Sequence, residues 1–287
     1  MANLKEIRNR ISSVSSTMQI TSAMKMVSAA KLKRAQDAIT AMRPYAEKLT
    51  ELIQNLSGSL EGDAAGKFAE QREVNKVLVV AIASNRGLCG AFNSNVLKQV
   101  KSITAQYNHD NVGIFAIGKK AYESLLKTEY VVANRSDIFD DLTFDNVAEI
   151  AESLTNMFLE GQYDKIVIVY NQFKNAATQV VVEEQFLPLA PIEVSEVATT
   201  ESDYIYEPSK EEIVFTLIPK SLKTQLYKAI RDSYASEHGA RMTAMHKATD
   251  NAKDLRDQLK LTYNKARQAA ITNEILEIVG GAEALNG

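Results

Sequence analysis

The residues that most resemble a binding site lie in the segment Ser84–Asn93 (SNRGLCGAFN), between a buried apolar run and a helical stretch. In a doubly wound α/β fold, phosphate groups bind at such a strand-to-helix turn. The segment matches neither GxGxxG nor GxxxxGK[ST], because Gly87 and Gly90 are three residues apart and no lysine follows them. The pattern therefore favours a tight turn, with nucleotide binding as the less favoured alternative.

The other groups that could do chemistry are scattered. Cys89, the single cysteine, has no histidine near it in sequence, so a Cys–His nucleophile is not expected, and it can form no internal disulfide, which fits a reducing compartment. His238 and His246 are eight residues apart and lack the Glu-x-x-His spacing of helical metal sites. The adjacent acids Asp140-Asp141 and Glu183-Glu184 would point to opposite faces of a strand. We therefore predict no catalytic residue, metal site or cofactor, and no enzymatic activity.

The charges are unevenly distributed, although the net charge is only −3. Residues 1–43 hold eight basic and two acidic residues, residues 220–270 hold eleven and five, and residues 44–219 hold fourteen and twenty-six. Two basic arms on an acidic body fit either an acidic partner or polyanion, or simply solvated helix faces. The chain begins without the apolar core of a signal peptide and has no uninterrupted apolar segment of ~20 residues, so it is expected to be soluble by itself.

The N-terminal arm carries a 3.5-residue apolar repeat, which predicts a coiled-coil helix. Thirteen of the sixteen repeat positions are apolar: Leu4, Ile7, Ile11, Val14, Met18, Thr21, Lys25, Ser28, Leu32, Ala35, Ile39, Met42, Ala46, Leu49, Ile53 and Leu56. Between Thr21 and Ser28 the stripe is polar, and we expect it to shift to Met24 and Val27. Pro44 predicts a bend.

The C-terminal arm predicts a second long helix, from Lys220 to about Val279. Its stripe comprises Met242, Met245, Thr249, Ala252, Leu255, Leu259, Thr262, Ala266, Ala269, Asn273 and Leu276. The step from Ala252 to Leu255 is out of phase and predicts local overwinding. Pro219 is expected to start or kink this helix and Gly280-Gly281 to end it. Two such helices, one at each terminus, pair most simply in antiparallel fashion.

The middle of the chain predicts a doubly wound, mostly parallel sheet. Continuous apolar runs at 77–83, 112–117 and 166–170 are typical of strands buried on both faces, and they alternate with helical stretches at 93–107, 119–127 and 144–160. The run 178–184 is expected to add an antiparallel edge, and 57–66 a loop. The predicted fold class is α/β plus a long α-helical coiled coil. Its parts are an N-terminal helix over 1–57, a Rossmann-like domain over 70–208 and a C-terminal helix over 209–287.

Several motifs are more distinctive than these patterns. In chain order they are Ile7–Ile11 (IRNRI), Gln19–Lys31 (QITSAMKMVSAAK), Ser84–Gly90 (SNRGLCG), Asp203–Pro208 (DYIYEP), Ala235–Met245 (ASEHGARMTAM), Ala248–Ala252 (ATDNA), Tyr263–Ile275 (YNKARQAAITNEI) and Glu277–Ala282 (EIVGGA). Together they resemble the gamma subunits of bacterial F-type ATP synthases. The cysteine pair of some chloroplast members is absent, so the resemblance implies no thiol control.

The resemblance implies a non-catalytic rotor stalk that couples ion flow to ATP synthesis or hydrolysis by rotation. The implied partners are three alpha and three beta subunits, the epsilon subunit and the membrane c-ring, with no nucleic acid. The catalytic sites lie on the beta subunits, whose lever segments are acidic in this family. The implied location is the cytoplasmic face of the bacterial inner membrane, with membrane association through the complex only.

The resemblance also implies which residues meet these partners. Contacts with the alpha/beta ring fall on Met24, Lys25, Arg241, Arg267, Gln268, Thr272 and Glu274, and contacts with the c-ring on Tyr204, Tyr206 and Glu207. Each ring residue could instead be a solvated helix position, and Met24 a seam residue. Asn273, where many relatives carry Gln or Lys, leaves the contacts of that turn open.

Two rival functions remain open at this point. One is a Rossmann-like nucleotide-binding enzyme whose helices dimerise, and the other is a nucleic-acid-binding coiled coil that uses the basic arms. The second is weakened by the acidic body and by the lack of aromatic residues among the basic ones.

Overall fold

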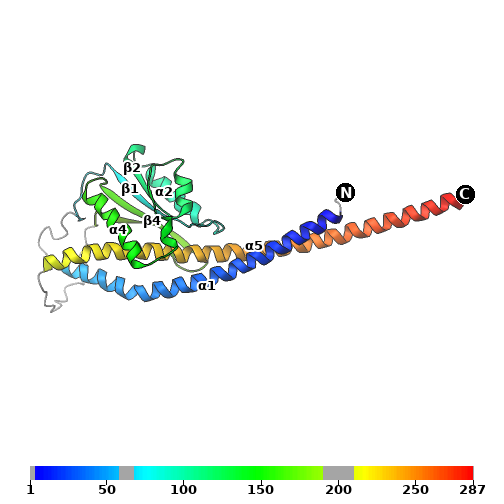
Figure 1. Cartoon of the computed structure of the whole chain (residues 1–287), viewed down its shortest axis with the longest axis horizontal. Helices are drawn as coiled ribbons and strands as arrows, with labels where there is room; N and C mark the ends of the chain where they lie inside the picture. Colours follow the sequence, from blue (N-terminus) through cyan, green and yellow to red (C-terminus); the bar gives the residue numbers. More distant parts are fainter. Residues whose placement is uncertain (1–3, 58–67, 190–209, 287) are drawn as a thin grey trace. The chain divides into compact units, whose positions relative to one another are not determined.

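The computed structural model describes residues 4–57, 68–189 and 210–286. By its internal contacts the chain divides into two compact units, Met1–Ser28 with Met242–Gly287 and Ala29–Arg241. The two longest helices, α1 (Leu4–Ser57) and α5 (Lys210–Asn286), contribute to both units (Figure 1). The predicted division into parts over 1–57, 70–208 and 209–287 stays a prediction. The expected loop at 57–66 lies almost entirely outside the described residues.

The larger unit contains a five-stranded sheet in the order β3-β2-β1-β4-β5 (Figure 1). Its strands are β1 (Val77–Ile82), β2 (Val112–Ile117), β3 (Val131–Asn134), β4 (Lys165–Phe173) and β5 (Gln179–Leu187). The pairs β3–β2, β2–β1 and β1–β4 are parallel, and β5 is an antiparallel edge. The predicted mostly parallel sheet is thus confirmed, with β3 as a strand that sequence analysis missed.

Helices cover both faces of this sheet, as doubly wound folds require. On one face α2 (Phe92–Thr104) and α3 (Lys119–Leu125) pack against the odd-numbered residues of β1. On the other face α4 (Phe144–Leu159) and the early part of α5 enclose a core that includes Phe158 and Ile230. The two apolar layers explain why β1 and β2 are buried at every position.

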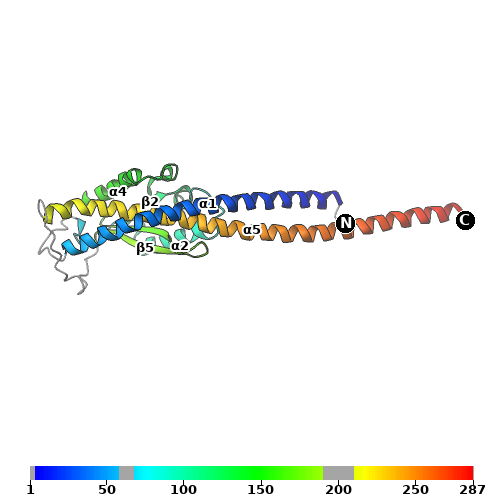
Figure 2. The same ribbon diagram turned by 90° about the horizontal axis from the view of Figure 1, so that it is seen from below.

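In the larger unit α5 is the long helix that packs on the sheet, and residues 29–57 of α1 run alongside it in both views (Figures 1 and 2). Of the two alternatives expected for Pro219, a helix start is wrong, because the helix begins at Lys210 and contains Pro219, whereas a kink there stays a prediction. Gly280-Gly281 does not end it either, since the helix continues to Asn286. Glycine in a helix costs only about 1 kcal/mol, so it permits a helix end without enforcing one. Pro44 lies inside α1, and the bend expected there stays a prediction.

In the smaller unit the N-terminal part of α1 pairs with α5 in antiparallel fashion, as predicted (Figure 2). An Arg8 guanidinium nitrogen lies 2.8 Å from the Tyr263 hydroxyl. Further along, Arg256 lies 3.6 Å from the Met18 sulfur, and the hydroxyls of Thr21 and Thr249 are 2.8 Å apart. As the residue number rises on α1 it falls on α5, which fixes the direction of pairing.

The seam of this pair keeps its phase where sequence analysis expected changes. Thr21 and Ser28 are buried while Val27 is 56% exposed, so the predicted shift to Met24 and Val27 is wrong. The Thr21 hydroxyl donates to the Met18 carbonyl and the Ser28 hydroxyl to the Met24 carbonyl. These bonds let polar side chains occupy the seam.

The out-of-phase step predicted in α5 is also wrong. Leu255 is 47% exposed, and the more enclosed positions follow alternating steps of three and four. These positions are Met245, Thr249, Ala252, Arg256, Leu259, Tyr263 and Ala266. Arg256 and Tyr263 were not expected at the seam. The methylene groups of Arg256 and the ring of Tyr263 can lie along the seam while their polar ends reach solvent.

Beyond Ala266 the described part of α5 is exposed throughout. This segment carries Ile271, Ile275, Leu276, Ile278 and Val279, which are 48–66% exposed. Together these side chains form an exposed apolar surface that the described part of the chain does not cover. Among the described helices, none combines the length and apolar character needed to span a membrane.

Candidate functional site

The turn between β1 and α2 lies where the strand order changes direction, because β1 is flanked by β2 on one side and β4 on the other. In doubly wound folds, ligands bind outside the carboxyl ends of the strands at this point. Asn93 and Ser84 fix the turn: the Asn93 side-chain oxygen accepts from the Ser84 backbone N–H at 3.0 Å, and the Ser84 hydroxyl donates to the Arg86 carbonyl at 2.6 Å. Leu88 and Gly90 adopt positive φ angles of 62° and 60°.

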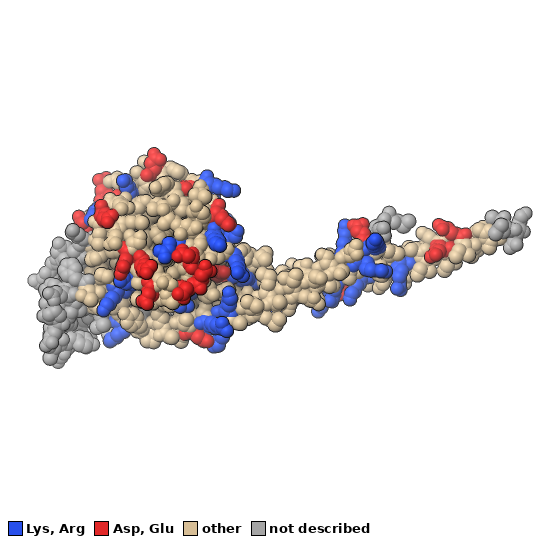
Figure 3. Space-filling view, in the orientation of Figure 1, with Lys and Arg blue, Asp and Glu red and all other residues tan. Residues whose placement is uncertain are grey.

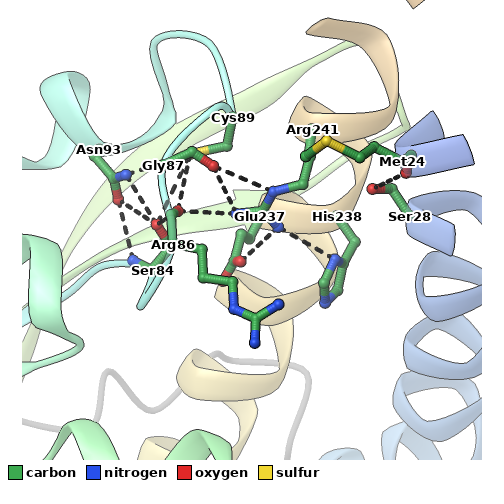
Figure 4. A network of polar contacts seen from close by, with 10 residues as sticks. All are labelled: Met24, Ser28, Ser84, Arg86, Gly87, Cys89, Asn93, Glu237, His238 and Arg241. Atoms are coloured by element: carbon green, nitrogen blue, oxygen red, sulfur yellow. Dashed lines mark hydrogen bonds and ion pairs between the residues drawn. The ribbon is translucent and has the colours of Figure 1, made fainter. Parts of the chain in front are cut away.

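Arg241 of α5 enters this turn (Figure 4). Its Nη2 donates to the carbonyl oxygens of Arg86 at 2.9 Å and Gly87 at 3.3 Å, and its Nε donates to Gly87 at 3.3 Å. On the other edge, Nη1 donates to Glu237 Oε1 at 2.6 Å and lies 3.4 Å from His238 Nδ1. The Arg241 and Glu237 side chains are each 9% exposed.

The polarity of this arrangement opposes phosphate binding. A phosphate cradle directs backbone N–H donors at an anion, whereas here two carbonyl oxygens point at a cation. The place where a nucleotide would bind is therefore used by the chain's own arginine. The prediction of a tight strand-to-helix turn is confirmed by the geometry of Ser84–Asn93.

Burial sets the protonation of the groups around Arg241. Burial raises the pKa of the Glu237 carboxyl, and the positive charge of Arg241 acts in the opposite direction. Burial, followed by the charges of Arg241 and Lys31, lowers the pKa of His238 to about 3, so this imidazole is neutral at neutral pH. Burial also raises the pKa of Cys89, which is 1% exposed and hydrogen-bonded by Asn93. A buried structural thiol fits this setting better than a nucleophile.

The positive φ of Leu88 provides a stability prediction. A non-glycine residue in this region is strained by about 1 kcal/mol, and the Leu88 side chain is 65% exposed, so its removal loses little packing. Leu88→Gly is expected to raise the free energy of unfolding by up to ~1 kcal/mol, measured by urea denaturation of the purified chain. A decrease of that size would mean that the exposed leucine makes a stabilising contact in the folded chain.

The residues expected to contact partners occupy three kinds of environment. Met24 and Lys25 are half-buried on α1, and Arg241 is buried in the turn just described. Four residues near the end of α5 are exposed: Arg267, Gln268, Thr272 and Glu274. The expected c-ring contacts Tyr204, Tyr206 and Glu207 lie outside the described residues.

Sequence analysis missed Glu237 and His238 as partners of Arg241. The signal was the i,i+4 spacing of Glu237 and Arg241, which also occurs in exposed helical ion pairs such as Lys33–Asp37. Spacing alone does not distinguish a buried pair from a surface pair.

The acidic pair Glu183-Glu184 behaves as predicted, with the two side chains on opposite faces of β5. Glu183 accepts from Gln99 of α2, whereas Glu184 accepts from Tyr170 at 2.9 Å and from Gln225 of α5 at 2.7 Å. Among the residues that the structure describes, no group of three or more His, Cys, Asp or Glu could hold a metal ion.

The surface charge follows the uneven distribution seen in the sequence. On the face shown in Figure 3, acidic side chains gather over the α/β domain. Along the paired helices of the smaller unit, Lys and Arg predominate until the end of α5, where Glu274 and Glu277 introduce negative charge.

Comparisons with known proteins agree along the full length. The family model described as ATP synthase matches residues 3–285. The chain is 75% identical over 287 residues to the ATP synthase gamma chain of Flavobacterium psychrophilum and 54% identical to that of Cytophaga hutchinsonii, covering all of each.

Among solved structures, a chain of the central stalk/c-ring of the Tetrahymena thermophila mitochondrial ATP synthase is 26% identical, with a TM-score of 0.61. The match covers 80% of this chain and 99% of that one. A chain of the Euglena gracilis mitochondrial ATP synthase has the same fold, with a TM-score of 0.70, 21% identity and coverage of 98% and 94%.

Proposed function

Because this chain belongs to the ATP synthase gamma-chain family, and so acts as the rotor stalk that couples ion flow to ATP synthesis or hydrolysis by rotation, we propose which of its surfaces meet the other subunits. The observation that carries this proposal is the antiparallel pairing of the two chain ends. A shaft must resist unwinding under torque, and two helices joined along a continuous seam resist it better than a single helix or a loop.

The alpha/beta ring surrounds the end of α5 in this proposal. The exposed apolar segment from Ile271 to Val279 supplies a contact surface that the chain itself does not cover. The exposed Arg267 and Gln268 lie just before it, and Thr272 and Glu274 lie within it. The acidic lever segments of the beta subunits would face Arg267, whose planar guanidinium can grip a carboxylate with two donors.

The half-buried Met24 and Lys25 contribute a second ring contact on α1. A contact of Arg241 with the ring stays a prediction, because its guanidinium is already bonded within the chain. Differential contacts of these residues with the open and closed forms of each beta subunit would bias its nucleotide affinity, which is what coupling requires.

The remaining assignments complete the proposal. The chain is non-catalytic, consistent with the carbonyl-lined turn at the switch point. It binds the c-ring through Tyr204, Tyr206 and Glu207, contacts the epsilon subunit, and lies at the cytoplasmic face of the bacterial inner membrane through the complex.

Removal of the basic contact should weaken the rotor without unfolding it. Arg267→Ala combined with Gln268→Ala is expected to reduce ATP turnover of the reconstituted complex about tenfold, because a charge-assisted contact of this kind is lost while two exposed side chains are shortened. Turnover is measured alongside the circular dichroism of the purified chain. The matched control, Gln258→Ala with Lys260→Ala, alters two exposed residues of the same helix and should retain activity. Equal activity of both variants would remove Arg267 and Gln268 from the contact surface.

Co-purification tests the assembly itself. A tagged chain recovered from membranes is expected to bring alpha, beta, epsilon and c subunits with it, identified by mass spectrometry. The rival enzyme function predicts saturable nucleotide binding by the isolated chain, whereas the rotor function predicts none in a calorimetric titration with ATP or NAD. Saturable binding without the other subunits would overturn the proposal.

A further inference from the structure

We propose that Arg241 is the clamp that fastens α5 to the α/β domain, so that the domain and the helix turn as one body. This inference rests on the proposed rotor function and adds a positioning residue that acts inside the stalk. The clamp consists of Arg241 and Glu237 on α5 and the carbonyl oxygens of Arg86 and Gly87 in the β1–α2 turn.

The clamp lies beyond the main apolar core that holds α5 to the sheet. The main core on this face of the sheet includes Ile218, Leu222, Leu226, Ala229 and Ile230 of α5 and extends no further along the helix. Arg241 follows eleven residues later, about 16 Å along the helix axis. It is also the last residue of α5 that belongs to the larger unit, so the clamp marks the point at which the helix leaves that unit.

Apolar side-chain contact at this level is less extensive than in the main core, although Gly239 brings the helix close to Phe173 and Ala176. Ala240 packs with Cys89 and Phe92 in a cluster of three residues. Such packing opposes separation, but it has no preferred direction and does little against sliding or rotation of a helix about its axis. The hydrogen bonds of Arg241 are directional and therefore resist that motion.

Each side of the clamp is held in place by hydrogen bonds within its own segment. Glu237 and His238 position the guanidinium on α5, one at each side of Nη1. In the turn, the Ser84 hydroxyl donates to the Arg86 carbonyl and accepts from the Asn93 side-chain amide at 2.8 Å, so the Arg86 acceptor oxygen is fixed by side chains of its own segment (Figure 4). These bonds restrict the movement of α5 relative to the α/β domain.

The use of backbone acceptors explains why this residue is arginine. A lysine could keep its charge opposite Glu237, but its compact ammonium cannot hold a carboxylate on one edge and two carbonyls on the other. The clamp also explains the turn motif Ser84–Asn93 without any nucleotide: its hydrogen bonds shape a receptor for Arg241.

The test uses the full chain in reconstituted ATP synthase vesicles and replaces the pair with Glu237→Met and Arg241→Met together. Replacing a buried ion pair by apolar residues of similar volume preserves folding in other proteins, while here it removes every bond to the turn. Lys33→Met with Asp37→Met is the control, since it alters an exposed ion pair of the same i,i+4 spacing. Two readouts are measured: protons pumped per ATP against an opposing gradient, and the rate at which N-ethylmaleimide labels Cys89, followed by mass spectrometry.

The double variant is expected to assemble with the other subunits like the control, with at least a twofold lower pumping ratio and at least tenfold faster labelling of Cys89. Arg241→Lys is likewise expected to lower the pumping ratio and to speed the labelling of Cys89. This variant replaces the double variant if the double variant does not assemble. A pumping ratio equal to that of the control would overturn the clamp, whatever the labelling rate. Failure of the wild-type chain to restore pumping would instead contradict the proposed function.

Discussion

Gly118→Ala is expected to lower the free energy of unfolding of this chain by about 4 kcal/mol, which is a large fraction of the stability of an ordinary domain. Gly118 joins β2 to α3 with φ 106° and ψ 137°, a conformation that side chains rarely allow. A Cβ atom there would lie 2.8 Å from the Ala83 carbonyl carbon and closer still to its oxygen. Backbone strain and overpacking then act together, because backbone atoms cannot rotate away.

Urea denaturation followed by circular dichroism measures this effect, and Gly87→Ala is the matched control. A Cβ at Gly87 meets nothing within 4 Å, so this change should lie within about 0.5 kcal/mol of the parent chain. Equal urea midpoints for Gly118→Ala and Gly87→Ala would show that the β2–α3 junction can relax. The junction also matters for the clamp, because the Lys120 N–H donates to the Ser84 carbonyl at 3.0 Å and the Lys119 N–H to Asn85 Oδ1 at 3.0 Å.

The sequence predicts the elements of this chain best where one physical signal dominates. The runs that became β1, β2 and β4 are continuous and apolar, and burial on both faces leaves few other structures for them. The short β3 has only three apolar residues, at an edge of the sheet, and its strand state depends on pairing with β2 rather than on its own pattern.

The coiled-coil seam shows where hydrophobicity alone misleads. The apolar Val27 and Leu255 face solvent while Thr21, Ser28 and Arg256 are more enclosed, because the position of a residue on the partner helix decides its burial. A stripe drawn from apolar residues alone therefore shifts at these points, although the helices keep their phase.

The candidate site was predicted only in part, for a related reason. The turn was found from its glycines and its place after a strand, but nothing in the sequence shows that Arg241, 155 residues beyond Arg86, fills it. Helical arginines are usually solvated, and the long-range contact exists only once α5 packs on the sheet. Contacts between residues far apart in sequence are not visible in local patterns.

The buried His238 makes the chain sensitive to acid, and this is the second large effect that we predict. The ring is 5% exposed, meets the Tyr234 ring edge-on with centroids 4.5 Å apart, and faces Arg241 through Nδ1. In the folded chain the pKa is lowered from 6.5 to about 3, so between these values the unfolded state binds the extra proton. The contribution of His238 to the free energy of unfolding is therefore fully present above pH 6.5 and is lost as the pH falls toward 3.

Because of His238, the free energy of unfolding is expected to fall by about 2 kcal/mol between pH 7.5 and pH 5, and by a total of the order of 4 kcal/mol near pH 3. Glu237 acts in the opposite sense, because its raised pKa favours the folded state as the pH falls toward its unfolded value. His238→Asn keeps an acceptor for Arg241 and removes only the titrating ring, so subtracting its pH profile from that of the parent chain isolates the histidine. Urea denaturation of both chains at pH 7.5 and pH 5 provides the comparison. If the two chains lost the same stability between these pH values, His238 would not be the acid-sensitive group, and the tight enclosure of the Arg241 cluster on which the low pKa depends would have to be looser than the structure shows.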